Sequence, residues 1–204
     1  PARADRSGEG VLRGEEVVER RIDVAQYVYV FDVTPTSFSL ANVDAEPRSL
    51  SVTSSGEWEA RNVPEWITLS ASEGTGGGVA EALTLKAAGQ NLELKERSAT
   101  IEFGSKQNSL TSNVTVTQAA FIFTVTPGET LLPTLSTDHY NLNIACSGPW
   151  TASSSAEWLE VSQASGPGNA TISYHPKAAN TDENPRKATI TVTSTLNNIT
   201  RTVE

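Results

Sequence analysis

The chain has 204 residues, a formal net charge of −9 and a pI of about 4.8. An acidic chain repels phosphate backbones, so nucleic acid is not expected among its partners. No apolar run approaches the ~20 residues that cross a bilayer as a helix, so no membrane span is predicted. The sequence has no Met and no recognisable signal peptide, and we expect it to be part of a longer protein.

Residues 1–26 differ from the rest of the chain in composition, because they are rich in Glu and Arg. Within them, Ile22–Gln26 resembles Val114–Gln118, since an aliphatic residue, Val and Gln occupy alternate positions in both segments. Two interpretations remain open. The segment is either a charged leader or the terminal hairpin of a preceding repeat, and an isolated hairpin would need a neighbour because it is marginal in water.

A repeat with a step of 92 residues organises the remainder of the chain. A constant step through unrelated residue types indicates that one module is present twice. We expect a first domain at residues 27–119 and a second at 120–204, each large enough for its own core. The residues repeated at this step include Phe31 and Phe123, Trp58 and Trp150, Trp66 and Trp158, and Gly74 and Gly166.

Short alternating runs dominate both copies. In the run from Lys187 to Ser194, Ala188, Ile190 and Val192 alternate with Thr, as is typical of half-buried strands. About seven such runs occur in each copy, separated by Gly, Pro, Asn and Ser. The pattern predicts an all-β fold of two tandem immunoglobulin-like antiparallel β-sandwich domains with about seven strands each.

One segment, Val79–Lys86, contains good helix formers but is predicted to be a strand. The matching part of the second copy, Thr171–Pro176, is β-branched and aromatic and ends in a proline, which would break a helix. The copies differ in length by three residues here, and we place the difference between this strand and Asn91, in a surface loop. The side chains expected to face inward are Leu83, Leu85 and Ala87.

The four tryptophans form two equivalent pairs. Trp58 and Trp150 alternate with polar neighbours and are predicted to be structural residues of the two cores. Trp66 and Trp158 have the opposite parity to the inward residues beside them. Each ring either folds over the open end of its sandwich or is an exposed flat surface that stacks on a sugar or a partner protein. Trp66 and Trp158 are therefore the candidate ligand-binding residues.

A glycine motif is shared by both copies. Gly74-x-Gly76 and Gly166-x-Gly168 look like fragments of phosphate loops. A nucleotide site also needs a following helix and a Lys, and neither is present. Tight turns with positive φ are the expected explanation.

An Asn–Arg spacing is also shared, since Asn91 and Arg97 are as far apart as Asn180 and Arg186. An Asn can hold its own turn, and an Arg can cap a sheet edge or pair with a carboxylate. The second copy alternates Asn and Asp here as a calcium loop does, but the first copy has Lys95 in this loop. A surface turn is favoured, and no metal site is predicted.

Catalytic and redox chemistry are not expected. His139 and His175 have no histidine counterparts in the other copy, and neither lies near a nucleophile motif. Cys146 is the only cysteine, so no disulfide can form within the chain, and its counterpart is Ser54. Cys146 is expected to be a small buried residue. The prediction is a protein that is not an enzyme and that has no cofactor.

Taken together, these motifs resemble the BACON family, an immunoglobulin-like module of Bacteroidetes surface proteins. The resemblance covers about residues 28–118 and 121–204. It implies a secreted, lipid-anchored or other cell-surface setting, or a periplasmic one, often beside glycan-degrading enzymes. The residues that carry it are Trp58, Trp66, Gly74, Asn91, Arg97, Ala99–Ile101 and Gln118 in the first copy, and Trp150, Trp158, Gly166, Asn180, Arg186 and Ala188–Ile190 in the second.

Three functions remain open. The first is a non-catalytic module of the cell envelope that spaces or presents other domains, in a glycan-utilisation or adhesion protein. The second is a carbohydrate-binding module that uses Trp66 and Trp158. The third is a protein-binding cell adhesin that uses exposed strand edges. Glycans or another surface protein are the expected partners, and the chain is expected to be a monomer.

Overall fold

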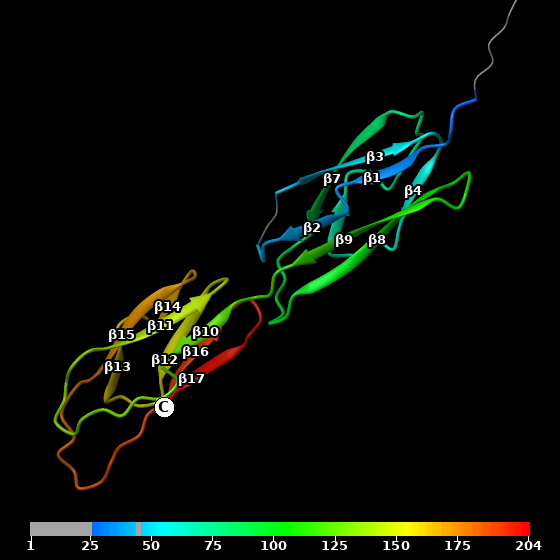
Figure 1. Ribbon diagram of the computed structural model, residues 1–204. Helices are drawn as coiled ribbons and strands as arrows, with labels where there is room; N and C mark the ends of the chain where they lie inside the picture. The colour runs from blue at the N-terminus through cyan, green and yellow to red at the C-terminus, as the bar shows by residue number, and fades with distance from the viewer. Residues whose placement is uncertain (1–25, 44–45) are drawn as a thin grey trace, which may run out of the picture.

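The computed structural model describes residues 26–43 and 46–204 (Figure 1). This part of the chain holds 17 strands and no helix, so the all-β prediction is confirmed. It accordingly contains no helix that could span a membrane. The leader or hairpin predicted at residues 1–26 lies outside the described residues, except for Gln26, which is not in a strand. Below, residues 26–118 are the N-terminal half and residues 119–204 the C-terminal half.

The N-terminal half has two sheets. One is antiparallel, with the order β1 (Phe31–Thr34), β3 (Arg48–Ser54), β7 (Ala80–Ala87), β5 (Ile67–Leu69). The other has the order β2 (Ser37–Leu40), β9 (Thr111–Gln118), β8 (Arg97–Ser105), β4 (Trp58–Arg61), β6 (Glu73–Gly74). In this second sheet β2 runs parallel to β9, and the other pairs are antiparallel.

The C-terminal half repeats this arrangement with one difference. Its first sheet has the order β10 (Phe123–Thr126), β11 (Tyr140–Cys146), β15 (Ala170–Pro176), β13 (Leu159–Val161). Its second has the order β14 (Ser165–Gly166), β12 (Trp150–Ser154), β16 (Ile190–Ser194), β17 (Thr200–Val203). Beside β17, the described residues of this half form no strand that corresponds to β2.

The described residues form nine strands in the first half and eight in the second, where about seven were predicted for each. One reason is that β1 and β2 belong to a single extended segment, interrupted at a cis Thr34–Pro35 peptide, whose two parts join different sheets. Another is that each half has a two-residue strand, β6 or β14, which a period of two cannot reveal.

Each half encloses its own hydrophobic core between its two sheets. Leu83, Leu85 and Ala87 are buried, as predicted, because β7 presents them to the opposite sheet. Cys146 is buried as well, and its counterpart Ser54 is buried at the same place in the other core. The largest fully buried side chains are Trp58 and Phe103 in the first half, and Trp150 and Phe123 in the second.

Strand register corrects the position of the three-residue length difference. Arg48 pairs with Leu85, and the equivalent Tyr140 pairs with Tyr174, so the offset between the halves is already 89 at this strand. The extra residues therefore lie before β7, in the loop 75–79, and not between β7 and Asn91 as predicted. This loop contains three consecutive glycines with positive φ, a conformation that favours glycine. The sequence comparison, which relied on residue types alone, aligned β7 and β15 with an error of three residues.

Candidate functional site

The inner indoles fill the centre of each core and face a glycine. Trp58 is 0% exposed and Trp150 is 1% exposed. They pair across neighbouring strands with Gly74 and Gly166, respectively. A Cβ on either glycine would lie 2.5 Å from an atom of the indole, which no packed structure tolerates. These glycines are therefore needed for close approach to the ring. The predicted positive φ is found at Gly76, with φ 71°, but not at Gly74, Gly166 or Gly168, where the prediction was wrong.

The outer indoles, Trp66 and Trp158, are half-buried, and each is covered by an arginine. Arg97 Cζ lies 4.7 Å from the centroid of the Trp66 ring, and Arg186 Cζ lies 4.2 Å from that of Trp158. Partial burial against this surface lowers the pKa of Arg97, because desolvation disfavours the charged form. A guanidinium over an indole contributes about 0.5–2 kcal/mol. One face of each ring is thus covered by an arginine of the same half. Sugar binding by the rest of the ring stays a prediction.

Arg97 also holds the end of β9, through a glutamine. The Oε1 atom of buried Gln118 accepts hydrogen bonds from Arg97 Nε at 2.8 Å and Nη2 at 2.6 Å. The Nε2 atom of Gln118 donates to the backbone oxygens of Asn42 at 2.9 Å and Gly89 at 3.1 Å. Arg97 therefore binds at the ends of two inner strands, β8 and β9, and not at a sheet edge, and its partner there is an amide and not a carboxylate.

The Asn residues hold their own loops, as one part of the prediction stated. Asn91 Oδ1 accepts from Glu93 N at 3.1 Å, and its Nδ2 donates to Lys95 O at 2.8 Å. Asn180 makes the same two bonds in the second half. Asn91 is fully buried, however, so its place is inside the fold and not on a surface turn. Within residues 26–43 and 46–204, no three His, Cys, Asp or Glu side chains gather as metal ligands would.

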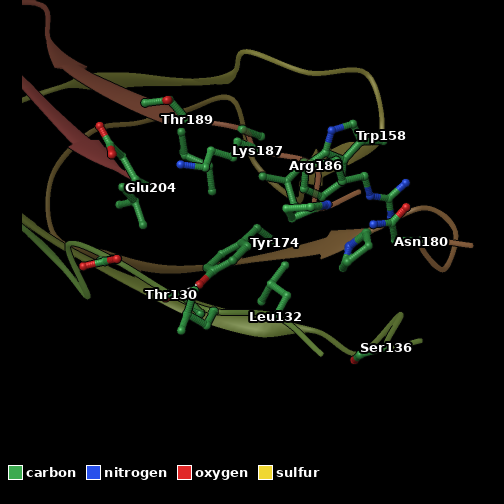
Figure 2. A pocket seen from close by; sticks show the side chains of 18 of the residues that line it. Thr130, Leu132, Ser136, Trp158, Tyr174, Asn180, Arg186, Lys187, Thr189 and Glu204 are labelled. Carbon is green, nitrogen blue, oxygen red and sulfur yellow. Dashed lines mark hydrogen bonds between the residues drawn. The ribbon is translucent and has the colours of Figure 1, made fainter. Parts of the chain in front are cut away.

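A cavity of about 420 Å³ lies in the C-terminal half (Figure 2). Tyr174 lies in its middle, and Trp158 and Arg186 lie together at one side. Its lining comes from several segments of this half, and includes Leu132, Ile190 and Val203. Sequence reasoning missed this cavity, because its lining residues lie far apart in the chain.

The two histidines come together, which the sequence analysis did not foresee. The ring centroids of His139 and His175 are 4.0 Å apart, and the rings are stacked at 29°. They belong to different strands or strand ends, since His175 lies in β15 and His139 immediately precedes β11. Their pairing follows from the antiparallel register of β11 and β15, in which the next residue, Tyr140, pairs with Tyr174. The expectation that the chain is not an enzyme stays a prediction.

Comparison with solved structures finds distant likenesses. A Bacteroides ovatus GH5 xyloglucanase in complex with a XXXG heptasaccharide is 16% identical over 45% of this chain, with a TM-score of 0.39, and this chain spans only 19% of that protein. The CsuC–CsuE chaperone–tip adhesion subunit complex of Acinetobacter baumannii is 10% identical, with 71% and 89% of the two chains covered and a TM-score of 0.37. Titin domains Z1Z2 in complex with telethonin are 12% identical, with 88% and 96% covered and a TM-score of 0.36.

No curated protein matches the chain. A family comparison does match: the BACON family, described as "Putative binding domain, N-terminal", is found at residues 56–119 and again at 148–203. The two segments together make up more than half of the chain, and each contains one inner and one outer tryptophan. The chain therefore belongs to the BACON family.

Proposed function

We propose that the chain is a non-catalytic module of the cell envelope that spaces or presents other domains. In this proposal each half is one immunoglobulin-like β-sandwich domain of a tandem pair. The observation that carries this proposal is that the residues shared by the two halves all have structural roles. In both halves the inner Trp fills a core, the glycine faces that Trp, the Asn holds its loop, and the Arg covers the outer Trp. What the copies have in common is thus accounted for by the fold.

The junction between the halves supports a spacing role. Only residues 119–122 separate β9 from β10. Beyond the bonds of Ala119, which directly follows β9, three hydrogen bonds among the described residues cross the junction, and two of them reach backbone atoms from side chains. They are Phe121 N to Glu93 O at 2.7 Å, Gln90 Nε2 to Ser147 O at 3.0 Å, and Asn197 Nδ2 to Leu92 O at 2.8 Å.

Neighbouring domains are by default expected to move relative to each other. A short connection with hydrogen bonds across it restricts this motion. The two halves lie end to end in an elongated arrangement (Figure 1). Such a pair acts as a strut, because its length is fixed by packing and hydrogen bonds and not by a flexible coil. The family membership is consistent with a place in a glycan-utilisation or adhesion protein at the cell surface or in the periplasm.

Small-angle scattering tests the spacing role. The wild-type chain is expected to give one extended distance distribution, and a Gln90→Ala, Asn197→Ala double variant a broader one. The control is Gln163→Ala, which removes an exposed glutamine whose Nε2 donates to Ser165 O, two residues along the chain. A wild-type chain that already samples many bent shapes, or a double variant indistinguishable from the wild type, would contradict the proposal.

A second candidate function is carbohydrate binding, which the cavity favours in the C-terminal half. Trp158 lines that cavity beside Asn180 and Arg186, whereas the arginine over Trp66, Arg97, is bound by Gln118. On a glycan array, this candidate predicts binding that Trp158→Ala abolishes and that Trp66→Ala leaves intact. Binding lost equally in both variants, or no binding at all, would reject it.

A further inference from the structure

Two stacked histidines lie on the outward face of the first sheet of the C-terminal half. The ring centroids of His139 and His175 are 4.0 Å apart, with 29° between the ring planes. His175 alternates with the buried residues of β15, and His139 directly precedes β11. The antiparallel pairing of Tyr140 with Tyr174 places the two histidines opposite each other. The chain has two histidines, and the fold brings both to one place.

The N-terminal half shows that the fold does not require this pair. It has a sheet of the same order, in which β3 and β7 correspond to β11 and β15. In the register of β3 with β7, the positions equivalent to the two histidines hold Pro47 and Lys86. Residues that one copy has and the other lacks are not explained by the shared design. The pair is therefore a candidate for a role that belongs to the C-terminal half.

One ring nitrogen of the pair has no partner of its own. The Nδ1 atom of His175 is buried, and among the described residues nothing bonds to it. Buried polar atoms in folded proteins are nearly always satisfied, so an exception of this kind points to a ligand. In a neutral imidazole one nitrogen carries a lone pair, and that nitrogen can bind a metal ion.

The separation of the rings is close to the one that a shared metal ion requires. Zn–N bonds are about 2.0–2.1 Å long, so two nitrogens on one tetrahedral ion lie roughly 3.3 Å apart. Stacked rings direct their lone pairs side by side, and one ring must turn for both lone pairs to meet at the ion. His139 is exposed and lies outside the strand, so its ring has room to turn between rotamers.

The charge around the pair favours a cation. Glu160 of β13 pairs with His175 of β15, and its side chain is exposed on the same face of the sheet. Side chains directly opposite each other in neighbouring antiparallel strands have Cβ atoms about 4.5–5.5 Å apart. The carboxylate therefore attracts a positive ion at His175, and the net charge of −9 acts in the same direction.

We propose that His139 and His175 together bind one divalent transition-metal ion such as Zn²⁺. Imidazole nitrogen suits Zn²⁺, Cu²⁺ and Ni²⁺, whereas Mg²⁺ and Ca²⁺ prefer oxygen ligands. Glu160 supplies charge and water completes the coordination shell, because no three such side chains gather as ligands in the part of the chain that the structure describes. The ion links β15 to the segment before β11. The proposal goes beyond the spacing role and does not rest on it.

Thermal unfolding of the full 204-residue chain, without a histidine tag, tests the proposal. The two rings meet only in the folded state, so the ion stabilises the C-terminal half. At a Zn²⁺ concentration about ten times the Kd, the unfolding temperature of that half should rise by about 6–11 °C. The N-terminal half should not respond. No rise with Zn²⁺, or an equal rise with the same concentration of Mg²⁺, would overturn the proposal.

Titration calorimetry with Zn²⁺ separates the pair from the acidic surface. His139→Ala removes an exposed ring and should weaken binding about tenfold or more, because the second ligand of a preformed pair acts at a high effective concentration. Glu160→Gln keeps both rings and should weaken binding less. Asn141→Ala, at the next outward position of β11, is the matched control and should bind like the wild type. Equal losses in the His139 and Glu160 variants would indicate an adventitious ion only and would overturn the proposal.

NMR of the chain with ¹⁵N-labelled histidine identifies the ligands directly. Because the chain has two histidines, each gives one set of ring signals. Added Zn²⁺ should shift ring nitrogens of both residues with a common midpoint and saturate at one ion per chain. A response from one ring alone, or saturation at half an ion per chain, would overturn the proposal.

Discussion

Gln118→Ala should destabilise the N-terminal half strongly. The side chain accepts two hydrogen bonds from Arg97 and donates to Asn42 O and Gly89 O. Both carbonyl oxygens keep another donor, Asn91 N and Arg97 Nη2, so the main loss falls on the guanidinium. A hydrogen bond to a charged group contributes about 1.5–3 kcal/mol, and a buried cavity adds to the cost. We expect the free energy of unfolding to fall by about 3 kcal/mol.

Calorimetry or urea denaturation measures this change. For a unit of this size, about 3 kcal/mol corresponds to a fall of roughly 12–24 °C in the unfolding temperature. The transition of the C-terminal half should move little, because Gln118 belongs to the first half. The exposed-glutamine control, Gln163→Ala, should stay within about 0.5 kcal/mol of the wild type. If Gln118→Ala also stays within that limit, the reasoning about the contact of Gln118 with Arg97 is refuted.

Three further predictions concern single contacts. Gly166→Ala should cost about 1–3 kcal/mol in urea denaturation, because its Cβ meets the inner indole, whereas Gly128→Ala, in open space, should be neutral; equal effects would contradict this. Arg97→Lys should cost about 1–2 kcal/mol and shift tryptophan fluorescence to the red, because Lys cannot stack and bind the amide at once; an unchanged spectrum would count against it. Lys106 lowers the pKa of Glu73, so Lys106→Gln should raise that pKa towards its ordinary value in an NMR titration. The pair adds stability above the unfolded-state pKa of Glu73 and loses it as the pH falls through the folded-state value, and an unmoved titration would disprove the contact.

Much of the fold could be predicted from period-two patterns and from the repeat. Alternation placed Leu83, Leu85 and Ala87 inward because a strand has only two faces. It also separated the two tryptophans of the first half. Trp58 falls on the inward side of its own segment, whereas Trp66 falls on the side opposite to its inward neighbour Ile67. What alternation could not supply was register, because pairing depends on partners far away in the chain. The three-residue difference was therefore misplaced until strand pairs fixed it.

Less of the candidate site could be predicted. The sequence presented Trp66 as an exposed ring or a lid, and nothing near it in the chain indicated that Arg97 would cover it. Gly74 was assigned to a turn with positive φ, but it is a glycine because a Cβ there would clash with the indole. Both requirements select glycine, so the sequence could not tell them apart. The cavity beside Arg186 left no mark in any single segment, because its lining residues come from segments far apart in the chain.

The most direct test of the central claim is the unfolding free energy of four Trp→Ala variants, measured by urea denaturation. If the indoles belong to one β-sheet design present twice, Trp58→Ala and Trp150→Ala should each cost about 3–5 kcal/mol in their own half. Trp66→Ala and Trp158→Ala should each cost at least about 1 kcal/mol, because they remove a ring that packs against the core beneath an arginine. Trp66→Ala and Trp158→Ala variants as stable as the wild type would contradict the claim. Trp66 and Trp158 would then again be candidates for binding a ligand.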